Sequence, residues 1–106
     1  KGEVALPLQE GETNISRMTI DFHDGIYHAW FPVKSVDVGY RCGYAESFDG
    51  FKWKRLDNNC LPVSESGWDS KAIDKMEVVR YQDKLYMFYN GNNFGRNGIG
   101  LAYTKA

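Results

Sequence analysis

Three carboxylates lie close together in the chain, at Asp69, Asp74 and Glu77. Carboxyl groups held near one another are common donors and acceptors of protons in hydrolytic chemistry. Each position also has a simpler interpretation. Asp69 follows Trp68 in a segment with turn character, where an aspartate often serves as a turn or cap residue. Asp74 beside Lys75, and Glu77 at the start of a strand, are positions where an acid can simply face water. The segment therefore contains a candidate acid–base site, with solvated loop residues as the alternative.

Other reactive residue types exclude several kinds of site. Two cysteines and two histidines lack the spacing of a zinc motif, so we expect no metal and no cofactor. Cys42 and Cys60 do not form a disulfide framework, and two free thiols are the expectation. Thirteen Lys and Arg stand against fourteen Asp and Glu, a net charge of −1, which disfavours nucleic-acid binding. The one basic cluster is interpreted as a solvated strand face: Lys52, Lys54 and Arg55.

The elements that must position these residues are strands. Among 106 residues there are seven Tyr, six Phe, three Trp and eleven Gly, a mixture that favours strands joined by tight turns. Residues 9–14 and 32–39 are predicted as loops. Alternating polarity and turn signals predict strands at residues 18–22, 26–31, 40–47, 51–55, 76–81, 85–89 and 99–104. The expected fold class is all-β, with two four-stranded antiparallel sheets.

The chain contains no apolar run long enough to cross a membrane as a helix. No basic start leads into an apolar stretch, so no signal peptide is expected. We therefore expect no membrane partner. The compartment stays open, with the cytoplasm as the default.

The two halves of the chain resemble each other. Met18 and Met76 lie 58 positions apart (76 − 18), and Gly43–Ser47 matches residues 100–104 in order and in its Gly-x-Ala start. The period is a little longer than those of common propeller repeats. A single domain of two propeller-blade-like repeats is expected, at about 16–58 and 74–106. Residues 3–8 are a candidate strand to complete the second unit.

The two histidines flank a predicted Asp-Gly turn. His23 and His28 are therefore interpreted as surface or rim residues of a hairpin rather than as a catalytic base. Glu46 lies in the repeated small-residue strand, where Tyr103 replaces it, and it is assigned a structural role.

One segment carries a family resemblance. Gly43–Trp53 reads G-x-A-x-S-x-D-G-x-x-W and resembles a blade signature of five-bladed β-propellers in the glycosidase group of arabinanases, β-xylosidases, invertases and levansucrases. Gly67–Ser70 and Tyr86–Asn92 are also similar to segments of glycosidase-like members. The resemblance covers about residues 16–106. It implies a propeller-blade architecture more specifically than it implies an activity.

Glycosidases of this group are expected to project carboxylates from inner strands, one as an acid and another as a base or nucleophile. By this resemblance, Asp74 and Glu77 are the catalytic candidates. The sequence departs from the family pattern at Met76, which replaces the usual proline. The comparable place in the first unit is residues 16–18, which include Arg17 but no carboxylate. Two blades therefore offer an incomplete acid–base set.

The same resemblance implies a carbohydrate ligand. Trp68 is the best stacking candidate because a flat aromatic face suits a pyranose, although burial between blades is an equal alternative. Asn90 and Asn92 offer hydrogen bonds to hydroxyl groups, although Asn-Gly clusters also simply make turns. With Asp69 and Arg17, these residues form the predicted ligand-binding set.

The number of units bears on function. Closed propellers contain about four to eight blades, and the flanks of two isolated blades would be aromatic and exposed. Such patches usually mean association, so we expect a homodimer ahead of a trimer, unless the chain is part of a longer propeller. The combined prediction is a non-catalytic, glycosidase-like blade protein that self-associates and binds carbohydrate. One alternative is a glycoside hydrolase completed by oligomerisation or by missing blades. Another is a plain protein-interaction module.

Overall fold

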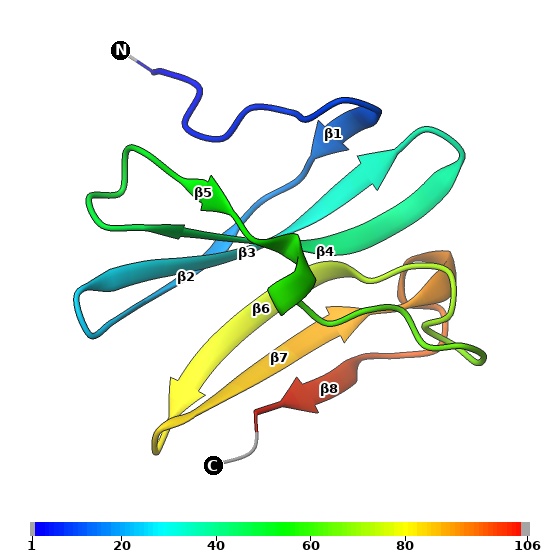
Figure 1. Ribbon diagram of the computed structural model, residues 1–106. Coiled ribbons are helices and arrows are strands. Elements are labelled where there is room, and N and C mark those ends of the chain that lie inside the picture. The colour runs from blue at the N-terminus through cyan, green and yellow to red at the C-terminus, as the bar shows by residue number, and fades with distance from the viewer. Residues whose placement is uncertain (1, 105–106) are drawn as a thin grey trace.

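The computed structural model describes residues 2–104, which fold into two antiparallel sheets (Figure 1). This confirms the expected all-β class. The described strands are β1 (Glu12–Ile15), β2 (Thr19–His23), β3 (Ile26–Ser35), β4 (Val38–Ser47), β5 (Lys54–Arg55), β6 (Asp74–Tyr81), β7 (Lys84–Asn90) and β8 (Gly100–Tyr103). Two short 3-10 helices lie in loops, η1 (Asp57–Asn59) and η2 (Asn92–Gly95).

The first sheet has the order β1-β3-β4-β5, and β2 also pairs with β3. Both β1 and β2 lie on the same edge of β3, where β1 pairs with its Val33–Ser35 end and β2 with its Ile26–Trp30 end. The loop predicted at residues 9–14 was wrong in its second half, because β1 begins at Glu12. The expected strand at 51–55 is shorter than predicted and consists of β5 alone.

The loop predicted at residues 32–39 was also wrong. Strands β3 and β4 continue through it and reverse at Val36 and Asp37, where Asp37 has a φ of 62°. Pro32 favoured a loop because proline cannot donate to a strand ladder. In the structure Pro32 faces the gap between β1 and β2, and its carbonyl accepts a hydrogen bond from the Ser16 amide. Its missing N–H therefore costs no ladder hydrogen bond.

The cysteines correct a further expectation. Cys42 on β4 and Cys60 after η1 are joined in a disulfide, with Cα atoms 5.8 Å apart, rather than present as free thiols. That separation is ordinary for a bridged pair. The chain after β5 folds back over β4, where the Leu56 amide donates to the Tyr44 carbonyl. Sequence spacing alone does not show this return.

The second sheet has three described strands in the order β6-β7-β8. The tight turn between β6 and β7 has positive φ at Gln82 and Asp83. Residues 3–8 do not supply a fourth strand here, since none of them is in a strand. Instead Leu6 packs against an apolar cluster of the first sheet. Within residues 2–104, β8 therefore keeps one edge unpaired.

The main core lies between the two sheets, and β6 is the strand of the second sheet nearest β2 and β3 (Figure 1). Its buried members are Trp30, Cys42, Tyr44, Ile73, Met76, Val78, Met87 and Tyr89. Thr19 Oγ1 donates a hydrogen bond to Glu77 Oε1 at 3.2 Å and accepts one from the Val78 amide at 3.3 Å. These bonds join β2 of the first sheet to β6 of the second.

Candidate functional site

Asp74 begins β6 and is almost completely buried, with 1% of its surface exposed. Its Oδ1 accepts a hydrogen bond from the Lys75 amide at 2.8 Å, and the Lys75 ammonium lies 3.6 Å from Oδ2. Within the described residues, Oδ2 has no hydrogen-bond partner. A buried carboxylate oxygen without a donor is costly. Among the predicted site residues, Asp74 is thus the one with a buried side-chain oxygen that accepts no hydrogen bond from the described residues.

Glu77 lies three residues after Asp74 on β6, and the pairing with β7 shifts register between them. Burial alternates along this strand, with Asp74 and Met76 buried and Lys75 and Glu77 exposed. The Glu77 carboxylate accepts the Thr19 hydroxyl hydrogen bond at the contact between the sheets. An acid and a base that act on one glycosidic bond must flank it together. In this chain Asp74 is buried, and the exposed Glu77 is engaged by the Thr19 hydroxyl.

Asp69 is buried in the loop before β6 and accepts a hydrogen bond from the Tyr89 hydroxyl at 2.8 Å. A hydrogen bond with Ser64, and then the one from Tyr89, hold the pKa of Asp69 below its usual range against the opposing effect of burial. Burial, together with the hydrogen bond to Asp69, raises the pKa of Tyr89 to about 12. The pair joins the loop to β7 as a carboxylate and a neutral phenol.

Trp68 is seated in a hollow of the second sheet. Its indole stacks with Tyr89 at 5.4 Å between ring centroids. A Cβ added at Gly91 or Gly100 would lie within 2.4 Å and 2.0 Å of indole carbons, so both glycines make room for the ring. Trp68 is still 37% exposed. Much of the ring is therefore occupied by the fold, and a sugar would reach only the remaining part.

The asparagines divide in role. Asn92 braces the loop, because its Oδ1 accepts the amides of Lys71 and Ala72 and its Nδ2 donates to the Gly67 carbonyl. Asn90 ends β7 and is the cross-strand partner of Asp74. The structure thus brings Trp68, Asp69, Asp74, Asn90 and Asn92 to one end of the second sheet. Arg17 is exposed between β1 and β2, on the first sheet.

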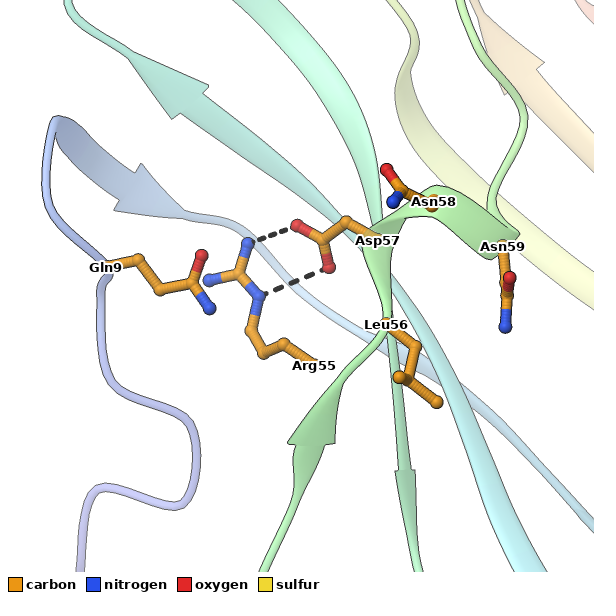
Figure 2. Close-up of a pocket in the computed structure, with 6 residues that line it drawn as sticks. All are labelled: Gln9, Arg55, Leu56, Asp57, Asn58 and Asn59. Carbon is orange, nitrogen blue, oxygen red and sulfur yellow. Dashed lines mark hydrogen bonds and ion pairs between the residues drawn. The ribbon is translucent and has the colours of Figure 1, made fainter.

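A buried ion-pair cluster was missed by the sequence prediction. The Arg55 guanidinium donates to both carboxylate oxygens of Glu12, at 2.8 and 2.7 Å, and to Asp57 at 3.2 and 2.5 Å. Figure 2 shows Arg55 facing Asp57, with Gln9 beside them. The Arg55 side chain is only 8% exposed, so the interpretation of Arg55 as a solvated basic residue was wrong. Its function is to join β1, β5 and η1.

A second cluster, also missed, lies on β3 and β4. His28 Nδ1 is 2.6 Å from the Tyr44 hydroxyl, which donates to Glu46 Oε2 at 2.8 Å. Burial, then the hydrogen bond to Glu46, raise the pKa of the Tyr44 phenol far above its usual range. Tyr44 and Glu46 are two residues apart on β4, so their side chains lie on the same face of the sheet. His28 on β3 pairs with Glu46, which places its ring beside the Tyr44 hydroxyl.

Residues 2–104 contain no group of three or more His, Cys, Asp or Glu side chains arranged to hold a metal ion. The helices of that same part of the chain are all too short to span a bilayer.

No family model matches this chain. The uncharacterized protein Rv1502 of Mycobacterium tuberculosis, also found in a second strain of that organism as MT1551, is 35% identical over 82 residues. That match covers 76% of this chain and 27% of the relative, so the chain spans about a quarter of the relative's length.

Solved structures share the fold. A glycoside hydrolase superposes with a TM-score of 0.69 at 20% identity, over 87% of this chain and 27% of that one. Zg3597, a family 117 glycoside hydrolase of the marine bacterium Zobellia galactanivorans, gives a TM-score of 0.72 at 14% identity, over 96% of this chain and 38% of that one. The resemblance to glycosidases is thus confirmed for the fold: this chain has the architecture of part of a glycoside hydrolase.

Proposed function

We propose that this chain is a non-catalytic, glycosidase-like blade protein that self-associates as a homodimer and binds carbohydrate. The observation that carries the proposal is the uncovered face of the second sheet, on the side away from the main core. Its apolar residues are Val79, Tyr81, Phe88, Leu101 and Tyr103, exposed by 47, 60, 44, 49 and 64%. We call this set the outer face. Cross-strand pairing of Phe88 with Leu101 makes it continuous across β7 and β8.

The outer face supports association because a continuous apolar patch on a sheet is unfavourable in water. A second copy presents the same patch, so two copies related by a two-fold axis cover each other. The open edge of β8 adds unpaired backbone groups beside the patch, and such edges favour pairing between chains. We therefore expect a dimer.

The association is tested by light scattering on the purified chain at micromolar concentrations. We expect a mass of twice the 12.1 kDa of one chain. Leu101→Lys and Phe88→Lys should return it to one chain mass, because each buries a charge in the interface. Phe51→Lys is the matched control, since Phe51 is equally apolar and 79% exposed but lies in the loop between β4 and β5. A monomeric native chain contradicts the proposal.

Two observations support binding without hydrolysis. The structural neighbours described above are glycoside hydrolases, while Asp74 is almost completely buried and Glu77 is bound by Thr19 at the contact between the sheets. A panel of aryl glycosides should therefore show no turnover above buffer. A glycan array should show binding, with Trp68→Ala as the variant that tests the predicted stacking residue. Turnover that disappears in Asp74→Asn or Glu77→Gln would overturn the non-catalytic assignment.

The unpartnered Oδ2 of Asp74 favours one second candidate function, a glycoside hydrolase completed by further sheets. In that case the missing partner of Asp74 comes from a neighbouring sheet or from the substrate. Turnover would then require association, so Leu101→Lys should abolish it together with the dimer. Turnover by the monomeric variant would exclude this candidate.

A further inference from the structure

A groove follows the seam between the two sheets, at the end away from Trp68. It consists of two adjoining hollows of about 290 and about 190 Å³ that share Trp30, Asn59, Leu85 and Thr104. One hollow has titratable side chains in its lining, from His28, Tyr44 and Arg80. The other is mostly apolar, with Leu61, Val78, Met87 and Ala102 among its lining residues. We call the whole the seam groove.

The hydrogen bonds of the Tyr44 hydroxyl determine whether His28 Nδ1 carries a proton. The Tyr44 hydroxyl has one proton, which it gives to Glu46 Oε2. His28 Nδ1, 2.6 Å from the same hydroxyl, must therefore carry a proton and donate it to the Tyr44 oxygen. In a neutral imidazole the other nitrogen, Nε2, is then an acceptor. No described residue forms a hydrogen bond with Nε2, so it is available to a ligand.

The charges in the hollow that His28 lines are balanced rather than cationic. Arg80 Nε and Nη2 both donate to Asp21 Oδ2, at 3.0 and 2.9 Å, which matches the guanidinium with one carboxylate. Asp24 and Asp83 also act on Arg80 through their negative charge. Glu46 adds a carboxylate 3.9 Å from His28 Nδ1. An anion would meet no unmatched positive charge here, so the groove suits a neutral ligand.

The remaining polar groups are mixed donors and acceptors. Arg80 Nη1 and the side-chain amide of Asn59 have no hydrogen bonds to other described residues. Thr104 Oγ1 accepts from the Leu85 amide at 3.0 Å, which leaves its proton to donate. Hydroxyl groups are the ligand groups that both donate and accept, and His28, Trp30 and Tyr44 form an aromatic wall beside them.

From these features we propose that the seam groove binds a neutral glycoside. The sugar hydroxyls contact His28, Asn59, Arg80 and Thr104, and an apolar aglycone lies against Leu61, Val78, Met87 and Ala102. The inference rests on the carbohydrate-binding part of the proposed function and moves the ligand away from Trp68. Trp30 lies between the two hollows, so both parts of the ligand contact it.

The test is calorimetric titration of the full chain with 4-nitrophenyl and methyl glycosides of neutral hexoses and pentoses. A 4-nitrophenyl glycoside should bind at least tenfold more tightly than its methyl counterpart, because only the aryl group fills the apolar hollow. His28→Phe keeps a ring in place but removes Nε2, and Asn59→Ala removes an exposed amide. Each should weaken binding about tenfold, the loss of one hydrogen bond. His23→Phe on β2 is the matched control and should leave affinity unchanged.

The outcomes separate the inference from the proposed function. Binding that survives both groove variants but is lost in Trp68→Ala overturns the seam groove and keeps carbohydrate binding elsewhere. Tighter binding of 4-nitrophenyl phosphate than of the glycosides overturns the assignment of a neutral ligand. No binding by any glycoside overturns both the groove and the carbohydrate function, while self-association is judged separately by mass. If His28→Phe does not fold, as checked by thermal unfolding, Asn59→Ala decides the question.

Discussion

The two sheets differ in how far other segments of the chain cover them. The first sheet has apolar clusters on both faces: one face packs against the second sheet, and the other is covered by Leu6 and Trp53. It also has the disulfide and the Arg55 ion pairs. The second sheet is covered on one face only and has neither. The difference shows that repeated strands do not by themselves give equal stability, because covering segments come from outside the repeat.

Equivalent glycines show the same contrast in detail. Gly43 on β4 and Gly100 on β8 both leave space for an aromatic ring, and an added Cβ would lie 2.2 Å from Phe31 or 2.0 Å from Trp68. Phe31 is fully buried within its own sheet, whereas Trp68 is 37% exposed and comes from a loop. Each glycine therefore leaves space for an aromatic ring. In the first sheet that ring belongs to a residue of a neighbouring strand, and in the second sheet it belongs to a residue of a loop.

The largest expected effect is on the first sheet. Replacing both Cys42 and Cys60 by Ala should lower the free energy of unfolding by about 3 kcal/mol, the usual effect of a disulfide that closes a loop of this size. The bridge spans 18 positions and ties the chain after η1 to β4. Urea unfolding measures the loss. Treatment of the native chain with reductant should give a similar loss, and no change in either case would show that the bridge does not contribute to stability.

The glycine pair gives the next effect. Gly43→Ala should cost about 2–3 kcal/mol, because Phe31 cannot move without disturbing the core. Gly100→Ala should cost about 1 kcal/mol, because the half-exposed Trp68 loop can shift. Thermal and urea unfolding of both variants provide the comparison. Equal losses of unfolding free energy in the two variants would contradict the idea that Trp68 can shift more easily than Phe31.

Acid should weaken the first sheet through Glu12. Hydrogen bonds from Arg55 lower the pKa of Glu12 below its ordinary 4.5. A lowered folded pKa means that the stabilisation is complete above about pH 4.5 and is lost as the pH falls through the folded value. Glu12→Gln should cost about 1–2 kcal/mol near neutral pH and flatten the acid limb of stability against pH. Glu3→Gln, at an exposed position, is the control, and an unchanged acid limb in Glu12→Gln would refute the role.

The smallest effect compares the two hairpin turns. Asp24-Gly25 joins β2 to β3, and Gln82-Asp83 joins β6 to β7, with positive φ at all four residues. Glycine is the residue that adopts this conformation without strain. Asp83→Gly should therefore stabilise the second sheet by about 0.5 kcal/mol, and Gly25→Ala should destabilise the first by about 1 kcal/mol. Urea midpoints of the two variants should shift in opposite directions; a shift in the same direction would be inconsistent with this comparison.

Sequence reasoning placed most strands and the hairpin turns well, because alternation and turn residues act between neighbours in the chain. It was wrong at Pro32. Proline disfavours a strand because it has no N–H to donate, but Pro32 faces the gap between β1 and β2, where no such hydrogen bond is needed. It also failed for the cysteines and for Arg55, whose partners lie in segments that approach only after the sheets form. At the candidate site, it selected residues that lie together at one end of the second sheet, but the burial of Asp74 and the contact of Glu77 with Thr19 depend on where the main core lies.

From the amino-acid order alone followed the all-β class, two antiparallel sheets and the matched spacing of the two halves. Only tertiary structure decided which face of each sheet is covered, that Trp68 sits over two glycines, and that His28, Tyr44 and Glu46 form one network beside a groove. The reason is the separation along the sequence over which each interaction acts. Strand propensity depends on residues a few positions apart, whereas covering a face or completing a network requires segments tens of positions apart to pack at a definite distance.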